Sequence, residues 1–168
     1  MSTRAISIAL RAYRRDATRK LHVHGTLGQC TGTPTLPRVG DWAQASRCFE
    51  ASDVAAFSGV TRDFNIIHSQ ASGQFKEAIV PGLFLASLIP AVFASAFPGA
   101  VYRSQELAFS RAVAVGSEVD CRVEVTRVRL MKGGVRGAVV VCDTHLTQRG
   151  NEAAAVAGVA SVFIPGAA

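Results

Sequence analysis

A long uncharged stretch follows Glu77, and its centre, residues 80–97, is apolar on every side. A helix that is apolar all round belongs inside a core, so we expect one long buried helix here. Pro90 should kink this helix or end its regular part, because an interior proline costs about 3 kcal/mol. The pair Pro98-Gly99 should stop it. A transmembrane span is the competing interpretation, but the interrupting prolines and glycines disfavour it.

Beyond Arg103 the pattern changes to the alternation that is typical of half-buried strands. A strand over residues 105–110 comes first, and a longer one begins at Gly116. The apolar phase of the longer strand slips by one residue near Thr126, which indicates a β-bulge. We expect hairpin turns at residues 132–134 and 149–151. A strand over residues 135–146 should lie between them, and a last strand should end at residues 163–164.

A strand is also expected before the apolar stretch, within residues 39–50, and a short helix should follow it. Ser52 is the candidate N-cap of this helix, with Asp53 in its first turn. The expected order is strand, short helix, irregular loop, long buried helix and four antiparallel strands. This order predicts the α+β class, with an antiparallel sheet wrapped around one long apolar helix.

The chain has 168 residues, about half of them apolar, which suffices for one domain with a substantial core. Its net charge of +6 is unevenly distributed. Residues 1–40 hold seven Lys or Arg against the single acid Asp16, whereas residues 41–168 hold eleven basic and eleven acidic residues. The body is therefore formally neutral, and a nucleic-acid footprint on the folded domain is not supported.

The basic leader has the pattern of an organelle presequence, which is amphipathic, rich in arginine and poor in acids. We expect a mitochondrial address to the matrix, with plastids as the second candidate. A disordered basic tail, or an arm that binds an acidic partner, is the alternative. Glycines and prolines make residues 25–38 a plausible linker. We therefore expect residues 1–38 to be leader and linker, and residues 39–168 to form a single domain. The apolar residues at helical spacing are Ile6, Leu10, Tyr13, Ala17 and Leu21.

The cysteines show no C-x-x-C spacing and no paired histidine nearby, so we expect no metal site. Three of them are expected to be small core residues, and the fourth a linker thiol. These four residues are Cys30, Cys48, Cys121 and Cys142.

The candidate chemistry lies in the loop between the two predicted helices, where Asp63, Asn65 and His68 form a D-x-N-x-x-H run. Adding water to a double bond conjugated to a thioester requires one group that takes a proton from water. It also requires a site that delivers a proton to the neighbouring carbon, and a carboxylate and an imidazole supply both. Taken alone the run is weak, because Asp and Asn also favour turns.

With this run between a short helix and a buried one, the chain resembles the MaoC-like (R)-specific hydratases and dehydratases of the hot-dog fold. The likeness covers residues 39–164. The family signature has an aromatic residue followed by a Gly-Asp-x-Asn-Pro-hydrophobic-His run. Arg62 stands where Gly is usual, and Ile66 where Pro is usual. The matching residues are Phe57, Asp63, Asn65, Ile67 and His68.

The resemblance implies that Asp63 and His68 hold a water and exchange protons with it and with the carbon beside the thioester carbonyl. It also implies that Gly82, at the start of the buried helix, binds the carbonyl oxygen through its N–H. A glycine at a helix N-terminus suits that role, although plain steric fit at the helix entry is the alternative. Asn65 is expected to brace the loop or a catalytic partner through its amide.

The function so implied is a reversible (R)-3-hydroxyacyl-thioester dehydratase that acts on acyl-carrier-protein substrates in mitochondrial fatty acid synthesis. An (R)-specific enoyl-coenzyme A hydratase is the main alternative, and a non-catalytic lipid-binding subunit is another. A thioesterase would need a carboxylate on the central helix, and residues 82–97 contain none. The resemblance further implies a homodimer, and hydration needs no redox cofactor.

Overall fold

The computed structural model describes residues 21–27, 36–131 and 137–166. Within this part of the chain six strands form one antiparallel sheet, in the order β1-β2-β4-β5-β6-β3. The strands are β1 (His24–Gly25), β2 (Trp42–Cys48), β3 (Val101–Phe109), β4 (Glu118–Leu130), β5 (Gly137–Gln148) and β6 (Val156–Pro165).

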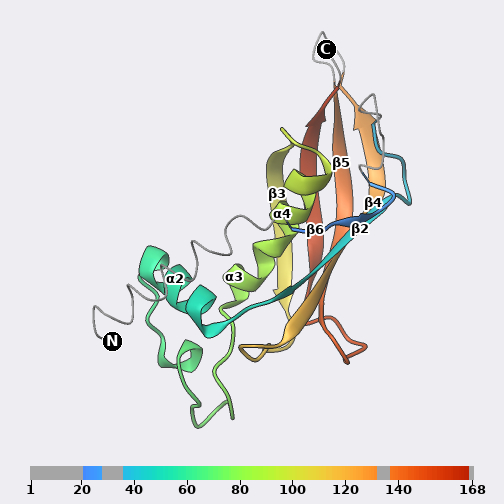
Figure 1. Ribbon diagram of the computed structural model, residues 1–168. Coiled ribbons are helices and arrows are strands. Elements are labelled where there is room, and N and C mark those ends of the chain that lie inside the picture. Colours follow the sequence, from blue (N-terminus) through green and yellow to red (C-terminus); the bar gives the residue numbers. More distant parts are fainter. Residues whose placement is uncertain (1–20, 28–35, 132–136, 167–168) are drawn as a thin grey trace.

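The helices connect β2 to β3 and confirm the predicted order of elements. In Figure 1, α4 lies across one face of the sheet, whereas α2 projects to one side of it. No helix in the described ranges is long and apolar enough to cross a membrane. The helical elements are α2 (Ala51–Thr61), the 3-10 turn η1 (Ile66–His68), α3 (Gly82–Ala86) and α4 (Leu88–Ala96).

The predicted long helix is interrupted at Ser87, between α3 and α4. Pro90 explains the position of the break, because its ring clashes with the carbonyl four residues earlier, that of Ala86, and it has no N–H to bond there. The Ser87 hydroxyl donates a hydrogen bond of 2.6 Å to the carbonyl of Phe84. Pro90 therefore interrupts the helix about one turn before its own position. The predicted stop at Pro98-Gly99 is confirmed.

The core lies between the helices and the inner face of the sheet. Alternate residues of β4 are buried as predicted, and the predicted bulge is confirmed by a register shift between Val125 and Arg127. Burial of each valine or leucine side chain stabilises the fold by about 1.5–3 kcal/mol. The largest contributors from the helices and β4 are Ile89, Val92, Phe93, Val119, Val123 and Val125.

The predicted N-cap of the short helix is wrong. The cap is Glu50, and it forms a reciprocal capping box with Asp53. The backbone N–H of Glu50 donates to the Asp53 carboxylate at 3.1 Å. Because Asp53 accepts this bond, the helix begins directly after the strand and includes Ser52. The hairpin expected at residues 132–134 lies outside the described residues.

The cysteines divide into two groups. Cys121 and Cys142 are buried as predicted, and burial raises the pKa of each thiol to about 12, so both are inert at neutral pH. Cys48 is only half-buried, contrary to the prediction. The pKa of the Cys48 thiol is raised to about 11. Partial burial is the largest cause, and a hydrogen bond to Glu50 is the next. Cys30 lies outside the described residues.

The sheet includes residues upstream of the expected domain start at residue 39. In β1, His24 is in register with Gln44 and Gly25 with Ala43. The N–H of Leu27 donates to the carbonyl of Trp42 at 2.9 Å, and the Leu27 side chain is buried in the core. The segment 21–27, which lies within the expected leader and linker, therefore packs on the sheet.

Deletion of residues 1–38 should lower the melting temperature, whereas deletion of residues 1–20 should leave it nearly unchanged. The longer deletion removes the β1–β2 pairing and the buried Leu27 side chain, which contributes about 1.5–3 kcal/mol. The shorter deletion removes none of these contacts. Thermal melts of the two truncated proteins measure the difference, and equal melting temperatures would show that β1 adds no stability.

Candidate active site

The predicted site residues Asp63, His68 and Gly82 line one hollow of about 220 Å³ that opens to solvent. The hollow lies between the end of α2, the loop that follows it and the first residues of α3. The structure thus brings together three residues that the sequence places on two separate segments. The remaining lining residues are Phe57, Thr61, Pro81 and Leu83.

The chain leaves α2 through a left-handed residue, Arg62, whose φ is 63°. Its N–H closes the helix by donating to the carbonyl of Ser58 at 2.8 Å. A residue with a Cβ pays about 1–2 kcal/mol for this conformation, which explains why glycine would be favoured here. The turn at Arg62 directs the next residue, Asp63, out of the helix and toward the hollow.

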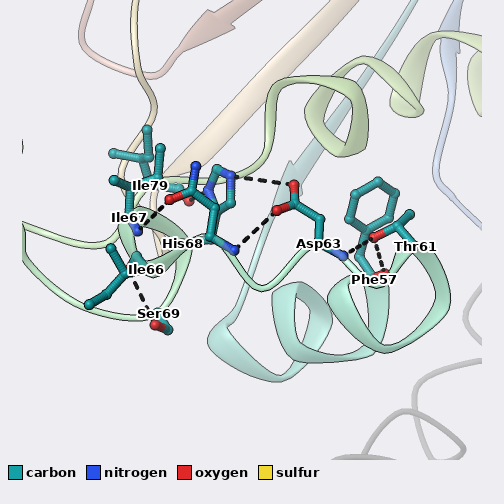
Figure 2. Close-up of polar contacts among 9 residues, drawn as sticks. Phe57, Thr61, Asp63, Ile66, Ile67, His68, Ser69 and Ile79 are labelled. Carbon is teal, nitrogen blue, oxygen red and sulfur yellow. Dashed lines mark hydrogen bonds and ion pairs between the residues drawn. The ribbon is translucent and has the colours of Figure 1, made fainter.

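Asp63 and His68 face one another across the hollow (Figure 2). The Oδ2 atom of Asp63 lies 3.8 Å from Nε2 of His68, which is too long for a direct hydrogen bond. The other ring nitrogen, Nδ1, lies 2.8 Å from the carbonyl oxygen of Ile79. A carbonyl can only accept, so Nδ1 carries a hydrogen, and the second ring nitrogen, Nε2, faces Asp63.

The two side chains differ in their exposure to solvent. The side chain of His68 is 11% exposed, whereas that of Asp63 is 46% exposed. The imidazole is therefore held by the protein, while the carboxylate meets solvent at the mouth of the hollow. A water that enters can bind both groups, since each offers an acceptor.

Asn65 braces the loop between these two groups. Its backbone N–H donates to Oδ1 of Asp63 at 3.1 Å, and its side-chain oxygen accepts from the N–H of Ile67 at 3.4 Å. The side chain thereby caps η1, the turn that carries His68. Asn65 does not line the hollow in the part of the chain that the structure describes.

Gly82 is the first residue of α3, and it packs closely against an aromatic ring. A Cβ at this position would lie 2.9 Å from the ring of Phe109 on β3. This contact is a steric reason for glycine, as the helix-entry alternative supposes. No backbone carbonyl outside the helix accepts the Gly82 N–H among the described residues. The steric interpretation of Gly82 thus has a contact in the structure, and its role in binding oxygen stays a prediction.

One aromatic ring, that of Phe57 on α2, lines the hollow, and it packs on other rings behind it. The ring of Phe57 stacks on that of Phe84, with centroids 4.6 Å apart, and Phe84 meets Phe49 edge to face. Thr61, which lines the hollow, was not predicted to belong to the site. For Thr61 the signal was a hydroxyl two residues before Asp63, a spacing at which Thr bonds main-chain groups.

The MaoC like domain family matches residues 33–146 of the chain, which is more than half of it. The chain belongs to the MaoC-like family. A mitochondrial 3-hydroxyacyl-[acyl-carrier-protein] dehydratase of Solanum lycopersicum is 34% identical over 61% of this chain and 64% of its own length. An (R)-specific enoyl-CoA hydratase of Aeromonas caviae is 37% identical over 76% of this chain and 95% of its own.

The fold agrees with this family assignment. The solved structure of an (R)-hydratase from Aeromonas caviae superimposes with a TM-score of 0.68 and 34% sequence identity. It covers 77% of this chain, and the match includes 98% of the hydratase chain. The prediction of an α+β hot-dog fold is therefore confirmed.

Two positions of this MaoC-like protein depart from the signature that carried the resemblance. Arg62 takes the left-handed conformation that glycine adopts without strain. Ile66 opens η1 in place of proline, and its side chain is exposed. Both substitutions leave Asp63 and His68 on the same hollow.

Proposed function

We propose that this MaoC-like protein catalyses the reversible removal of water from an (R)-3-hydroxyacyl thioester, giving the trans-2-enoyl thioester. The protein is a hydro-lyase of the dehydratase and hydratase type. One observation carries the proposal for the site. A carboxylate and an imidazole face the same hollow, 3.8 Å apart, beside the N-terminal residue of α3.

In the hydration direction, Asp63 and His68 would hold a water between them. The water has two hydrogens, and the pair offers two acceptors, the Asp63 carboxylate and Nε2 of His68. As the water oxygen bonds to the β-carbon of the enoyl group, one acceptor takes a proton. The electrons of the double bond shift toward the thioester carbonyl. Asp63 or His68 then returns a proton to the carbon beside that carbonyl. Dehydration reverses these steps.

Gly82 would stabilise the negative charge that develops on the thioester oxygen. The first N–H groups of a helix have no partner within the helix, and such groups favour an enolate-like oxygen over the neutral carbonyl. Because glycine has no side chain, the substrate can approach this N–H closely. Asn65 would act on the loop through its cap on η1.

The carrier of the acyl group is proposed to be acyl carrier protein, in mitochondrial fatty acid synthesis. The basic leader supports this choice, and so does the activity for which the Solanum lycopersicum relative is named. The Aeromonas caviae relative, named for enoyl-CoA, supports an (R)-specific enoyl-CoA hydratase as the second candidate.

Turnover on matched carrier-protein and coenzyme A thioesters, assayed side by side, tests this choice. We expect a higher kcat/KM for the carrier-protein substrate, because the protein carrier can contact the surface around the hollow as well as the thioester arm. Acyl chain length should be equal in the two assays. A strong preference for coenzyme A would defeat the first candidate and leave the second.

We place the protein in the mitochondrial matrix, with plastids as the second choice. The basic leader supports this placement. Because Leu27 and β1 pack on the sheet, the removable part of the leader should end before Leu21. N-terminal sequencing of the protein imported by isolated mitochondria locates the end.

A homodimer is proposed from one edge of the sheet, where no further strand pairs among the described residues. β3 lies at that edge, and it exposes Val101 and Phe109, while Leu83 is exposed at the start of α3. Unpaired, apolar edge strands favour pairing with another chain. Two copies that pair along β3 would continue the sheet and bring the two hollows near the subunit boundary. Light scattering of the active protein measures this, and a stable, active monomer would contradict it.

A further inference from the structure

The hydroxyl of Thr61 joins the end of α2 to the first residue of the catalytic loop. It donates a hydrogen bond of 2.9 Å to the carbonyl of Phe57, one turn earlier in the helix. It also accepts a bond of 3.3 Å from the backbone N–H of Asp63. Figure 2 shows both contacts. The Thr61 side chain therefore bridges two residues that line the same hollow.

This bridge spans the strained turn at Arg62. A left-handed residue other than glycine is costly, and a small rotation there would swing the Asp63 carboxylate relative to α2. The bond to Thr61 fixes the Asp63 backbone on the helix side of the turn. On the other side, Oδ1 of Asp63 accepts from Asn65. The 3.8 Å separation between Asp63 and His68 thus depends on restraints at both sides of Asp63.

We propose that Thr61 is a positioning residue, whose hydroxyl holds Asp63 at the separation from His68 that lets both groups bind one water. Thr61 takes no part in proton transfer, because its single hydrogen is donated to the carbonyl of Phe57. This inference rests on the proposed dehydratase function. It adds a residue that acts on Asp63 from the end of α2.

Three substitutions and one control test the role of the hydroxyl. Thr61→Val keeps the branched shape and removes the hydroxyl, Thr61→Ala provides a second variant without it, and Thr61→Ser restores it. The control is Thr126→Val at the bulge of β4, where another exposed threonine donates to the carbonyl of Val141 at 3.2 Å. The control removes the same kind of bond outside the hollow.

We expect Thr61→Val and Thr61→Ala to lower kcat about tenfold, because a displacement of about 1 Å at a reacting group costs up to a hundredfold. KM should change by less than about twofold, since Thr61 acts through Asp63 and not through substrate binding. Thr61→Ser should retain kcat within about twofold, and Thr126→Val should match the unmodified protein.

Wild-type kcat in Thr61→Val and Thr61→Ala would overturn the inference. A loss of kcat that Thr61→Ser does not restore would also overturn it, because the hydroxyl would then not be the cause. Asp63→Asn, assayed in parallel, separates this inference from the proposed function. An inactive Asp63→Asn beside a fully active Thr61→Val rejects only the role of Thr61. A fully active Asp63→Asn rejects the proposed chemistry itself.

Discussion

Asp63→Asn and His68→Gln should each lower kcat by at least about a hundredfold, because each removes one of the two groups that exchange protons with the water. Asparagine keeps the size of Asp63 but loses the charge and one acceptor. Glutamine at 68 cannot act as a base. The effect should fall on the chemical step, so kcat should decline more than the affinity for the thioester. Steady-state kinetics with an enoyl or 3-hydroxyacyl thioester measure the loss.

These variants should keep the fold. Asp63 is about half exposed, and neither residue belongs to the hydrophobic core. Asp143→Asn and His145→Gln provide matched controls, because both residues are exposed on β5 and lie outside the hollow. Thermal melts check that all four proteins are folded. Near-normal turnover in either Asp63→Asn or His68→Gln would refute the assignment of the catalytic pair.

Gly158→Ala should lower the free energy of unfolding by at least about 1–3 kcal/mol, the usual cost of overpacking. Gly158 on β6 pairs with Leu107 on β3. A Cβ at this position would lie 1.9 Å from the carbonyl oxygen of Glu106, and a backbone atom cannot swing away as a side chain can. The added methyl group should therefore displace β3. Because Phe109 on the same strand packs against Gly82, kcat should fall as well.

Gly59→Ala is the control for this prediction. Gly59 lies inside α2, and an added Cβ meets no atom within 4 Å. Alanine there should raise the free energy of unfolding by about 0.5–1 kcal/mol, the helix preference of alanine over glycine. Chemical denaturation of both variants measures the two opposite changes. Equal stability of Gly158→Ala and the unmodified protein would show that β3 is not held as closely as the structure places it.

The catalytic motif was recognisable because its members are close in sequence. Asp63, Asn65 and His68 fall within six residues, and their spacing, together with the order of the flanking elements, matched a known signature. The roles of Asp63, His68 and Gly82 in catalysis stay predictions. Thr61 was missed because its function depends on two hydrogen bonds whose geometry no residue spacing specifies. The steric reason for Gly82 was also hidden, since Phe109 is remote along the chain.

Predictions about the fold were likewise correct where local sequence pattern decides the structure, and wrong where a specific contact decides it. The alternation along β4, with its phase slip at Thr126, predicted a bulged strand, because side-chain direction in a strand follows residue parity. Pro90 predicted an interruption of the long helix, and the break falls at Ser87 because the proline acts on a carbonyl four residues earlier. The helix cap is Glu50 and not Ser52, because the Asp53 carboxylate reaches back to the N–H of Glu50, a contact that residue order alone does not specify.

Local spacing was thus sufficient to predict the fold class, the buried helical stretch and the loop that carries the carboxylate and the imidazole. Those features follow from residue periodicity and from short-range order along the chain. The pairing of β1 with β2 and the contact between Phe109 and Gly82 emerged only in three dimensions. Such contacts join segments far apart in sequence, and the packing of the whole domain selects them among many partners of similar chemistry.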